Sequence, residues 1–256
     1  MIGALAGDII GSIYEHQPIK RVDFPLFGPG SRFTDDTVMS LAVARAILRG
    51  SEYGVEMKIL GRRYPGAGYG TNFFHWLFEE EINPYHSWGN GSAMRVSPIG
   101  YGYDTEEDVL REARATALVS HNHPEGVKGA LSVALAIQLA RKGADKEVIR
   151  DRIQADFGYN LDRTIEEIRP GYRFDVSCQG SVPEAIIAFL DSSDYESAVR
   201  LAVSLGGDAD TQACIAGGIA EAYYGGVPEE IQREVKARLP DDLRAILEDF
   251  VNRPRR

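Results

Sequence analysis

The stretch 204-SLGGDADTQACIAGGIAEAYYGG-226 decides how the chain is interpreted. Two glycines and two aspartates, Asp208 and Asp210, run directly into an apolar segment of small residues. Apolar positions at steps of three and four residues predict a helix, which ends at Gly225. The stretch therefore predicts a hydrophobic helix with clustered carboxylates at its N-terminus.

A second stretch, 31-SRFTDDTVMSLAVARAILRG-50, has the same arrangement. Thr34 is a good N-cap, and Asp35 and Asp36 in a first turn favour the positive end of the helix dipole. The same capping explanation applies to Asp210 or Thr211 in the later stretch. Capping accounts for either cluster taken alone, but neither helix needs so much negative charge to be capped.

Helical periodicity also dominates the rest of the chain, and alternation of period two is almost absent. We therefore predict an all-α fold, a compact bundle of many helices. The sequence contains no low-complexity linker and no fixed-period repeat, so we expect a single domain over residues 1–256. The predicted helices cover residues 36–48, 105–120, 124–143, 182–192, 195–205, 211–225 and 228–239.

Two regions lack helical periodicity. Residues 16–33 form a loop rich in proline, glycine and aromatic residues, and residues 64–104 are rich in glycine, aromatic and small polar residues. Long irregular segments inside a compact helical domain are usually functional. We expect ligand contacts there.

Composition excludes several classes of protein. A chain of 256 residues with 44% hydrophobic residues can bury a sizeable core, and its net charge of −10 argues against general nucleic-acid binding. The two cysteines form neither a disulfide framework nor a zinc site, which favours a reduced, cytoplasmic protein. The apolar N-terminus is interrupted by Asp8 and indicates neither a signal peptide nor a membrane span. We expect a monomer with no membrane association.

Paired carboxylates at two helix starts point to divalent cations. Side chains of adjacent helical residues diverge by about 100°, so Asp35 and Asp36 can serve neighbouring ions. Asp208 and Asp210, in an extended segment, would project to the same side. Four converging carboxylates would repel one another unless cations neutralised them, and an all-oxygen set favours Mg²⁺ or Mn²⁺ over zinc. Two ions about 3.5–4 Å apart would form a common catalytic arrangement.

Other candidates have weaker support from the residues alone. Glu15 is a possible general acid/base, although an isolated glutamate before a loop is typically solvated, and Asp8 is expected to hydrogen-bond nearby backbone. Residues 89–94 form either an anion-binding nest or an ordinary turn. His121 and His123 lack a third metal ligand, which favours a nucleotide contact or a capping role.

The motifs together resemble those of the ADP-ribosylglycohydrolases, which include the dinitrogenase reductase-activating glycohydrolase and the eukaryotic ADP-ribosyl-acceptor hydrolases. The resemblance rests on GDIIGSIYE, FTDDTVM, GNGSAMRVSPIG, SHNHP and GGDADT, in that order, and covers residues 2–226. It implies an orthogonal all-α bundle with two bound ions, Mg²⁺ or Mn²⁺. The combination of TDDT and GGDADT is specific, whereas GNG or HNH alone is not.

The resemblance also implies roles for individual residues. Glu15 matches a glutamate on the mobile loop that covers the substrate, and His121 matches a histidine beside the bound nucleotide. The residues in the position of the diphosphate and distal-ribose contacts are Asn90, Gly91, Ser92 and Met94. The implied metal ligands are Thr34, Asp35, Asp36, Asp208, Asp210 and Thr211.

The implied activity is metal-dependent hydrolysis of the glycosidic bond between ADP-ribose and an acceptor. The acceptor is a modified protein side chain, such as arginine or serine, or a small-molecule conjugate. Asp208 or Glu15 would be the general base, and the sequence does not choose between them. Two alternatives remain at this point: a dinuclear phosphoesterase acting on a nucleotide or sugar phosphate, and a non-catalytic relative that binds ADP-ribose.

Overall fold

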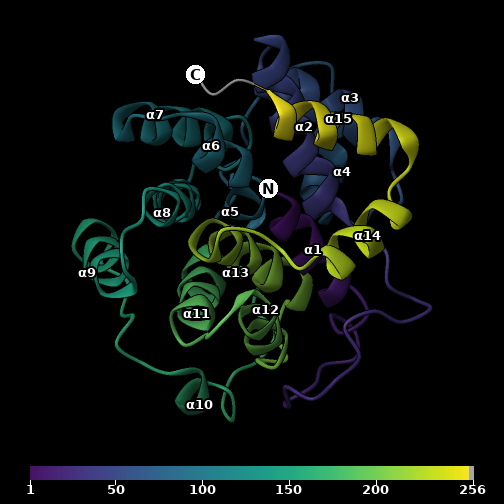
Figure 1. Ribbon diagram of the computed structural model, residues 1–256. Coiled ribbons are helices and arrows are strands. Elements are labelled where there is room, and N and C mark those ends of the chain that lie inside the picture. Colours follow the sequence, from purple (N-terminus) through teal and green to yellow (C-terminus); the bar gives the residue numbers. More distant parts are fainter. Residues whose placement is uncertain (254–256) are drawn as a thin grey trace.

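The computed structural model describes residues 1–253, which form α-helices joined by loops (Figure 1). Those residues contain no β-strand, and Gly89 and Ser177 form an isolated antiparallel bridge. The prediction of an all-α fold is confirmed. The helices are α1 (Ile2–Gly11), α2 (Asp35–Arg49), α3 (Tyr53–Arg63), α4 (Thr71–Phe78), α5 (Gly91–Met94), α6 (Ser97–Gly102), α7 (Glu106–Leu118), α8 (Pro124–Arg141), α9 (Lys146–Phe157), α10 (Ile165–Ile168), α11 (Cys178–Leu190), α12 (Tyr195–Val203), α13 (Ala209–Tyr224), α14 (Glu229–Arg238) and α15 (Asp241–Asn252).

Each predicted helix is found, and α13 ends at Gly225 as predicted. Gly50 and Gly225 close α2 and α13 in the left-handed conformation, and Thr105 caps α7 through its hydroxyl. Residues 64–104 are less irregular than expected, because α4, α5 and α6 lie within them. Residues 16–33 contain no helix, as predicted.

Helices α1 and α13 form the centre of the bundle (Figure 1). Every residue of α1 is buried, and α13 is buried from Ala209 to Ala220. The two backbones approach so closely that a Cβ on Gly7 would lie 2.0 Å from the carbonyl oxygen of Ala213. Glycine at this position therefore permits the contact, which brings the last turns of α1 beside the first turn of α13.

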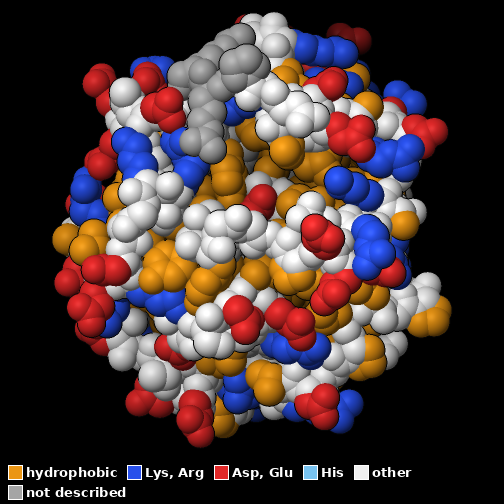
Figure 2. Space-filling view, viewed as in Figure 1, with side chains coloured by type: hydrophobic (Ala, Val, Ile, Leu, Met, Phe, Trp, Pro, Cys, Tyr) orange, Lys and Arg blue, Asp and Glu red, His pale blue; other side chains and the backbone are white. Residues whose placement is uncertain are grey.

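This packing determines where the site forms. The N-terminal end of α2 lies against α1, and α13 also contacts α2 and α5. Helix starts from distant parts of the sequence are thereby gathered at one end of the α1–α13 pair. On the face shown in Figure 2, acidic and basic side chains are interspersed. Among residues 1–253, no helix combines the length and hydropathy needed to cross a bilayer.

Candidate active site

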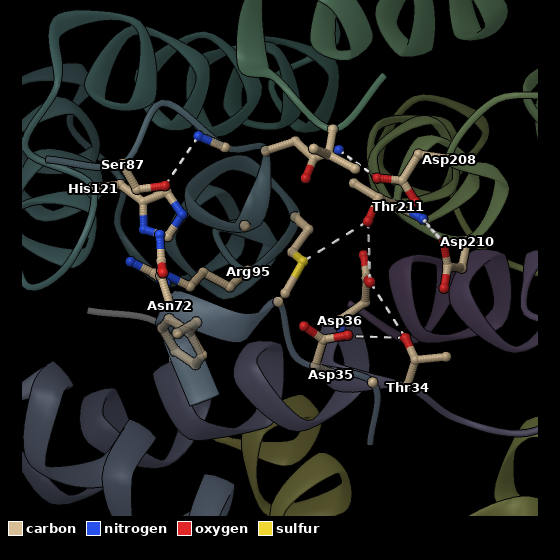
Figure 3. Close-up of a pocket in the computed structure, with 18 of the residues that line it drawn as sticks. Thr34, Asp35, Asp36, Asn72, Ser87, Arg95, His121, Asp208, Asp210 and Thr211 are labelled. Atoms are coloured by element: carbon tan, nitrogen blue, oxygen red, sulfur yellow. Dashed lines mark hydrogen bonds between the residues drawn. The ribbon is translucent and has the colours of Figure 1, made fainter. Parts of the chain in front are cut away.

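A cavity of about 560 Å³ opens where the starts of α2 and α13 meet (Figure 3). One wall carries acidic and hydroxyl side chains from these two helices. The other wall carries residues of the 64–104 region together with His121. A cavity of this size lies in the range typical for small-molecule and cofactor sites.

The start of α2 is capped in the ordinary way and is also held from outside. The Thr34 hydroxyl accepts a hydrogen bond from the backbone N–H of Asp36. Asp8, on α1, accepts hydrogen bonds from the N–H and hydroxyl groups of both Thr34 and Thr37. Four donors therefore fix the Asp8 carboxylate. Two of them are backbone N–H groups, as predicted, and the other two are hydroxyl groups. Asp8 anchors the first turn of α2 to α1.

The start of α13 is built differently. The helix begins at Ala209, so Asp208 is its N-cap and Asp210 lies in its first turn. The predicted extended geometry of this pair is therefore wrong, as is the prediction that Asp210 or Thr211 caps the helix. Asp208 makes no capping hydrogen bond; its Oδ2 instead accepts one of 2.7 Å from the Asn90 side-chain amide.

The two helix starts meet in space. The Thr211 hydroxyl donates to Asp36 Oδ2 at 3.2 Å, across 175 positions of sequence. Oxygen atoms of Asp8, Asp36 and Asp210 all lie within 4.8 Å of one another, and so do oxygen atoms of Glu15, Asp208 and Asp210. Asp210 belongs to both groups and therefore joins them.

Asp35 occupies a separate position on the acidic wall. Its backbone N–H donates to the Ala67 carbonyl at 2.9 Å, and a Cβ added to Gly68 would lie 3.6 Å from its Oδ1. The side chain lines the cavity but belongs to neither of the two carboxylate groups. As predicted from their 100° divergence, Asp35 and Asp36 face different surroundings.

Burial and mutual repulsion make this cluster unfavourable without positive charge. Burial, with repulsion from neighbouring carboxylates, raises the pKa of Asp36 and of Asp210 well above the ordinary value. The same causes raise the pKa of Asp35 to about 8. Burial raises the pKa of Asp8 to about 6, although its four hydrogen bonds oppose the rise. The cluster binds either protons or cations in order to be stable.

The donor set fits a divalent cation. Asp36 Oδ1 is buried and has no hydrogen-bond partner among the described residues. Its neighbours in the cluster offer carboxylate and hydroxyl oxygens, the ligands that Mg²⁺ and Mn²⁺ prefer. An unpaired, buried carboxylate oxygen costs free energy unless a ligand meets it. The residues present therefore suit a bound cation.

Glu15 lies at the edge of the acidic wall, beyond the end of α1. Its side chain is 25% exposed, and its Oε2 lies 3.6 Å from His16 Nε2. Burial and the charge of Asp208 raise its pKa. No described N–H or O–H group donates a hydrogen bond to it, and His16 is the ionisable side chain that its carboxylate contacts.

The 89–94 segment forms the floor between the two walls. Asn90, Gly91 and Met94 line the cavity, and α5 begins at Gly91. Ser92 is buried and faces away, because its hydroxyl donates to the Gly126 carbonyl at 2.7 Å and does not reach the cavity. Asn90 instead connects the floor to α13 through Asp208.

The two histidines separate into different roles. His121 lines the cavity, and burial together with the charge of Arg95 lowers its pKa well below the ordinary value. His123 caps α8, because its Nδ1 accepts a hydrogen bond of 3.1 Å from the backbone N–H of Glu125. Of the roles expected for this pair, His123 takes the capping one.

Several lining residues were not predicted individually. They share a position on the wall opposite the carboxylates, and Figure 3 shows Arg95 and Asn72 beside His121 there. Arg95 directly follows the GNGSAM motif, so its place in the sequence was a usable signal. The aromatic and small polar composition of residues 64–104 indicated ligand contacts in this segment, which supplies Asn72, Phe73, Tyr85, Ser87 and Trp88 to the lining.

Comparisons with known proteins identify relatives of this chain. Human ADP-ribosylhydrolase ARH3 is 28% identical over 96% of this chain and 90% of its own length. ADP-ribosylarginine hydrolase Tri1 of Pseudomonas putida is 26% identical over 90% of this chain and 71% of its own. A solved structure of an ADP-ribosylglycohydrolase-related protein complex superposes with a TM-score of 0.74 at 26% identity, covering 97% of this chain and 94% of that one. The ADP-ribosylglycohydrolase family model matches residues 1–256, and the chain belongs to this family.

Proposed function

We propose that the protein is a metal-dependent hydrolase that cleaves the glycosidic bond between ADP-ribose and an acceptor, releasing ADP-ribose. The observation that carries the proposal is the meeting of two acidic helix starts in one cavity, with Asp210 joining both carboxylate groups. Family membership and the names of the relatives, ADP-ribosylhydrolase and ADP-ribosylarginine hydrolase, support the reaction class.

The residues proposed to hold two divalent cations, Mg²⁺ or Mn²⁺, share buried oxygen donors at the starts of α2 and α13. When bound, such cations neutralise the carboxylates and supply Lewis-acid stabilisation of substrate oxygens. Asp36 and Asp210 supply the buried carboxylates, and the Thr34 and Thr211 hydroxyls each hydrogen-bond Asp36. The proposed set is Thr34, Asp35, Asp36, Asp208, Asp210 and Thr211.

Glu15 is our choice for the general base. Asp208 already accepts a hydrogen bond from Asn90 and interacts with Asp210, whereas no described group donates to Glu15. The Glu15 side chain lines the cavity and is 25% exposed, so a water molecule can reach its carboxylate. The pKa of Glu15 is raised toward neutral pH, and a general base is most effective when its pKa lies near the pH of the reaction.

The remaining walls bind and orient the substrate. The floor at Asn90, Gly91 and Met94 and the wall at His121 line the same cavity as the carboxylates, and its volume of about 560 Å³ suits a small-molecule ligand. Fixing the ribose against the base converts a bimolecular attack into a positioned one. An oxocarbenium-like transition state would be stabilised by the surrounding carboxylates, as in other glycoside hydrolysis.

The test is direct. Incubation with mono-ADP-ribosylated arginine and serine peptides, with Mg²⁺ or Mn²⁺, should release free ADP-ribose, identified by mass spectrometry. Release of AMP or inorganic phosphate would indicate a phosphoesterase. Glu15→Gln should bind ADP-ribose yet turn over poorly, whereas Asp249→Asn, far from the cavity lining, should match the wild type. Full activity after metal stripping, with excess chelator present, would reject the metal-dependent mechanism.

A further inference from the structure

The wall opposite the carboxylates contains a buried positive charge. The Arg95 side chain is fully buried, and no described carboxylate lies within 4 Å of its guanidinium. Its Nη2 donates to the Thr116 carbonyl at 2.7 Å and to Ser120 Oγ at 3.0 Å. Its Nε and Nη1 have no hydrogen-bond partner among the described residues. Burying an arginine without a carboxylate partner costs free energy, so we expect this charge to serve a role.

Ser120 links this arginine to the histidine of the cavity. Its Oγ lies 2.8 Å from His121 Nδ1 as well as 3.0 Å from Arg95 Nη2. An arginine only donates hydrogen bonds, so Ser120 accepts from Arg95. The single hydroxyl proton is then free to donate to Nδ1, and no described group offers it another acceptor. Nδ1 is therefore the unprotonated nitrogen of the ring.

The other ring nitrogen faces the cavity. A Cβ added to Gly91 would lie 3.1 Å from His121 Nε2, and one added to Gly89 would lie 3.6 Å away. These two glycines thus keep the space in front of Nε2 open. Nε2 makes no hydrogen bond within the described residues, and His121 lines the cavity. A neutral ring with Nδ1 unprotonated carries its proton on Nε2, pointing toward a ligand.

We propose that Arg95 and Ser120 are positioning residues that hold His121 as the Nε2–H tautomer, a neutral hydrogen-bond donor to a phosphate oxygen of the bound ADP-ribose. The identity of the ligand rests on the proposed function. The charge of Arg95 lies on the same wall, as Figure 3 shows, and favours an anionic group there. Burial and, to a smaller extent, the same charge lower the pKa of His121, which keeps the ring a neutral donor.

The tautomer is measurable in the ligand-free protein. A long-range ¹H–¹⁵N spectrum of ¹⁵N-histidine-labelled protein reports which ring nitrogen carries the proton. The five histidines give five patterns, and the one missing from His121→Gln belongs to His121. We expect a protonated Nε2 and an unprotonated Nδ1. An Nδ1–H ring, or a doubly protonated one, at neutral pH overturns the proposal.

Variants then separate positioning from structure. Ser120→Ala should lose the pure Nε2–H pattern and bind ADP-ribose about tenfold more weakly, since a hydrogen bond to a charged group is lost. Ser120→Thr keeps a hydroxyl and should restore both. Ser132→Ala, at a buried serine on α8 that bonds local backbone, is the matched control and should change neither. An unchanged tautomer in Ser120→Ala would show that the Arg95–Ser120–His121 hydrogen bonds do not set the tautomer, and would overturn the proposal.

Affinity and tautomer together decide the ligand contact. Native affinity in a Ser120→Ala protein whose tautomer has changed would overturn the role of Nε2 as donor. A wild-type protein that shows the expected tautomer but does not bind ADP-ribose would overturn the proposed function. The positioning of His121 by Arg95 and Ser120 would still stand. The two failures are therefore distinguishable.

Discussion

The starts of α2 and α13 look alike in sequence but differ in structure. At α2, Thr34 forms the capping hydrogen bond and Asp8 secures the turn, so every local donor there has a partner. At α13, the N-cap Asp208 makes no capping bond and directs its carboxylate to Asn90. The carboxylate and hydroxyl groups at the start of α2 therefore stabilise that helix, whereas the Asp208 carboxylate at the start of α13 contacts another segment of the cavity lining.

The difference shows that acidic residues at a helix start do not always cap the helix. The Thr34 hydroxyl accepts the capping hydrogen bond from the Asp36 N–H and also contacts the carboxylates of Asp8 and Asp36. An N-cap aspartate that leaves its own helix uncapped gives up about 1 kcal/mol of local stability. The Asp208 carboxylate accepts the hydrogen bond from Asn90 in place of a capping hydrogen bond.

The largest expected effect comes from Asp210, which joins both carboxylate groups. Asp210→Asn should lower kcat/KM at least about 1000-fold, because the loss of one ligand disturbs both groups and removes about 4 kcal/mol of transition-state stabilisation. Steady-state kinetics with Mn²⁺ measure this, with Asp249→Asn as the control. Activity within tenfold of wild type would show that the two starts do not act as one site.

Divalent cations should stabilise the protein by binding to the carboxylate groups that Asp210 joins. At one hundred times the dissociation constant, Mn²⁺ should add about 2.7 kcal/mol to the free energy of unfolding. Asp210→Asn should abolish this gain while folding normally in chelator, since the substitution relieves repulsion among buried carboxylates. Urea denaturation with and without Mn²⁺ provides the measurement. An equal gain in the variant would contradict a shared site.

The metal-free protein should become less stable as pH rises. The folded-state pKa of Asp8 is raised to about 6 and that of Asp35 to about 8, above their ordinary values. Raised carboxylate pKa values mean that the folded state binds more protons, so stability is highest below pH 4 for these groups and is lost through pH 6 and 8. Urea denaturation from pH 5 to 9 in chelator checks the sign. Saturating Mn²⁺ should flatten the profile.

The smallest effect separates the two starts by capping. Thr34→Ala should cost about 1–2 kcal/mol of metal-free stability, because it removes the α2 cap and a hydrogen bond to Asp8. Thr211→Ala should cost about 0.5–1 kcal/mol, because Thr211 caps nothing and gives up a hydroxyl hydrogen bond to Asp36 and a weak contact with Met94 Sδ. Thr34→Ser should retain most of the stability. Equal losses of stability in the two alanine variants would show that capping does not distinguish the start of α2 from the start of α13.

Much of the fold followed from the sequence, for identifiable reasons. Helices such as α7 and α12 have one apolar face and clear caps, so their periodicity and ends were predictable. Helix α1 was not identified as a helix, because all of its residues are buried and it has no polar face to set a period. Helices α4 to α6 were hidden by the glycine and aromatic content of residues 64–104.

The candidate site was predictable where motifs mark it and not where packing creates it. Asp36 and Asp210 were chosen from their motifs, and the cavity brings them together. The hydrogen bonds from the start of α2 to Asp8 depend on how α1 packs against α2, which no local pattern encodes. Ser92 lies in a motif yet faces the protein interior, because the short helix α5 turns its hydroxyl toward Gly126.

Anomalous diffraction from a crystal grown with Mn²⁺ tests the central claim most directly. A peak should lie within ligand distance of carboxylate oxygens from both Asp36 and Asp210, since these belong to the two helix starts and meet in the cavity. Absence of any peak there, or peaks that contact one helix start and leave the other without a cation, would contradict the account.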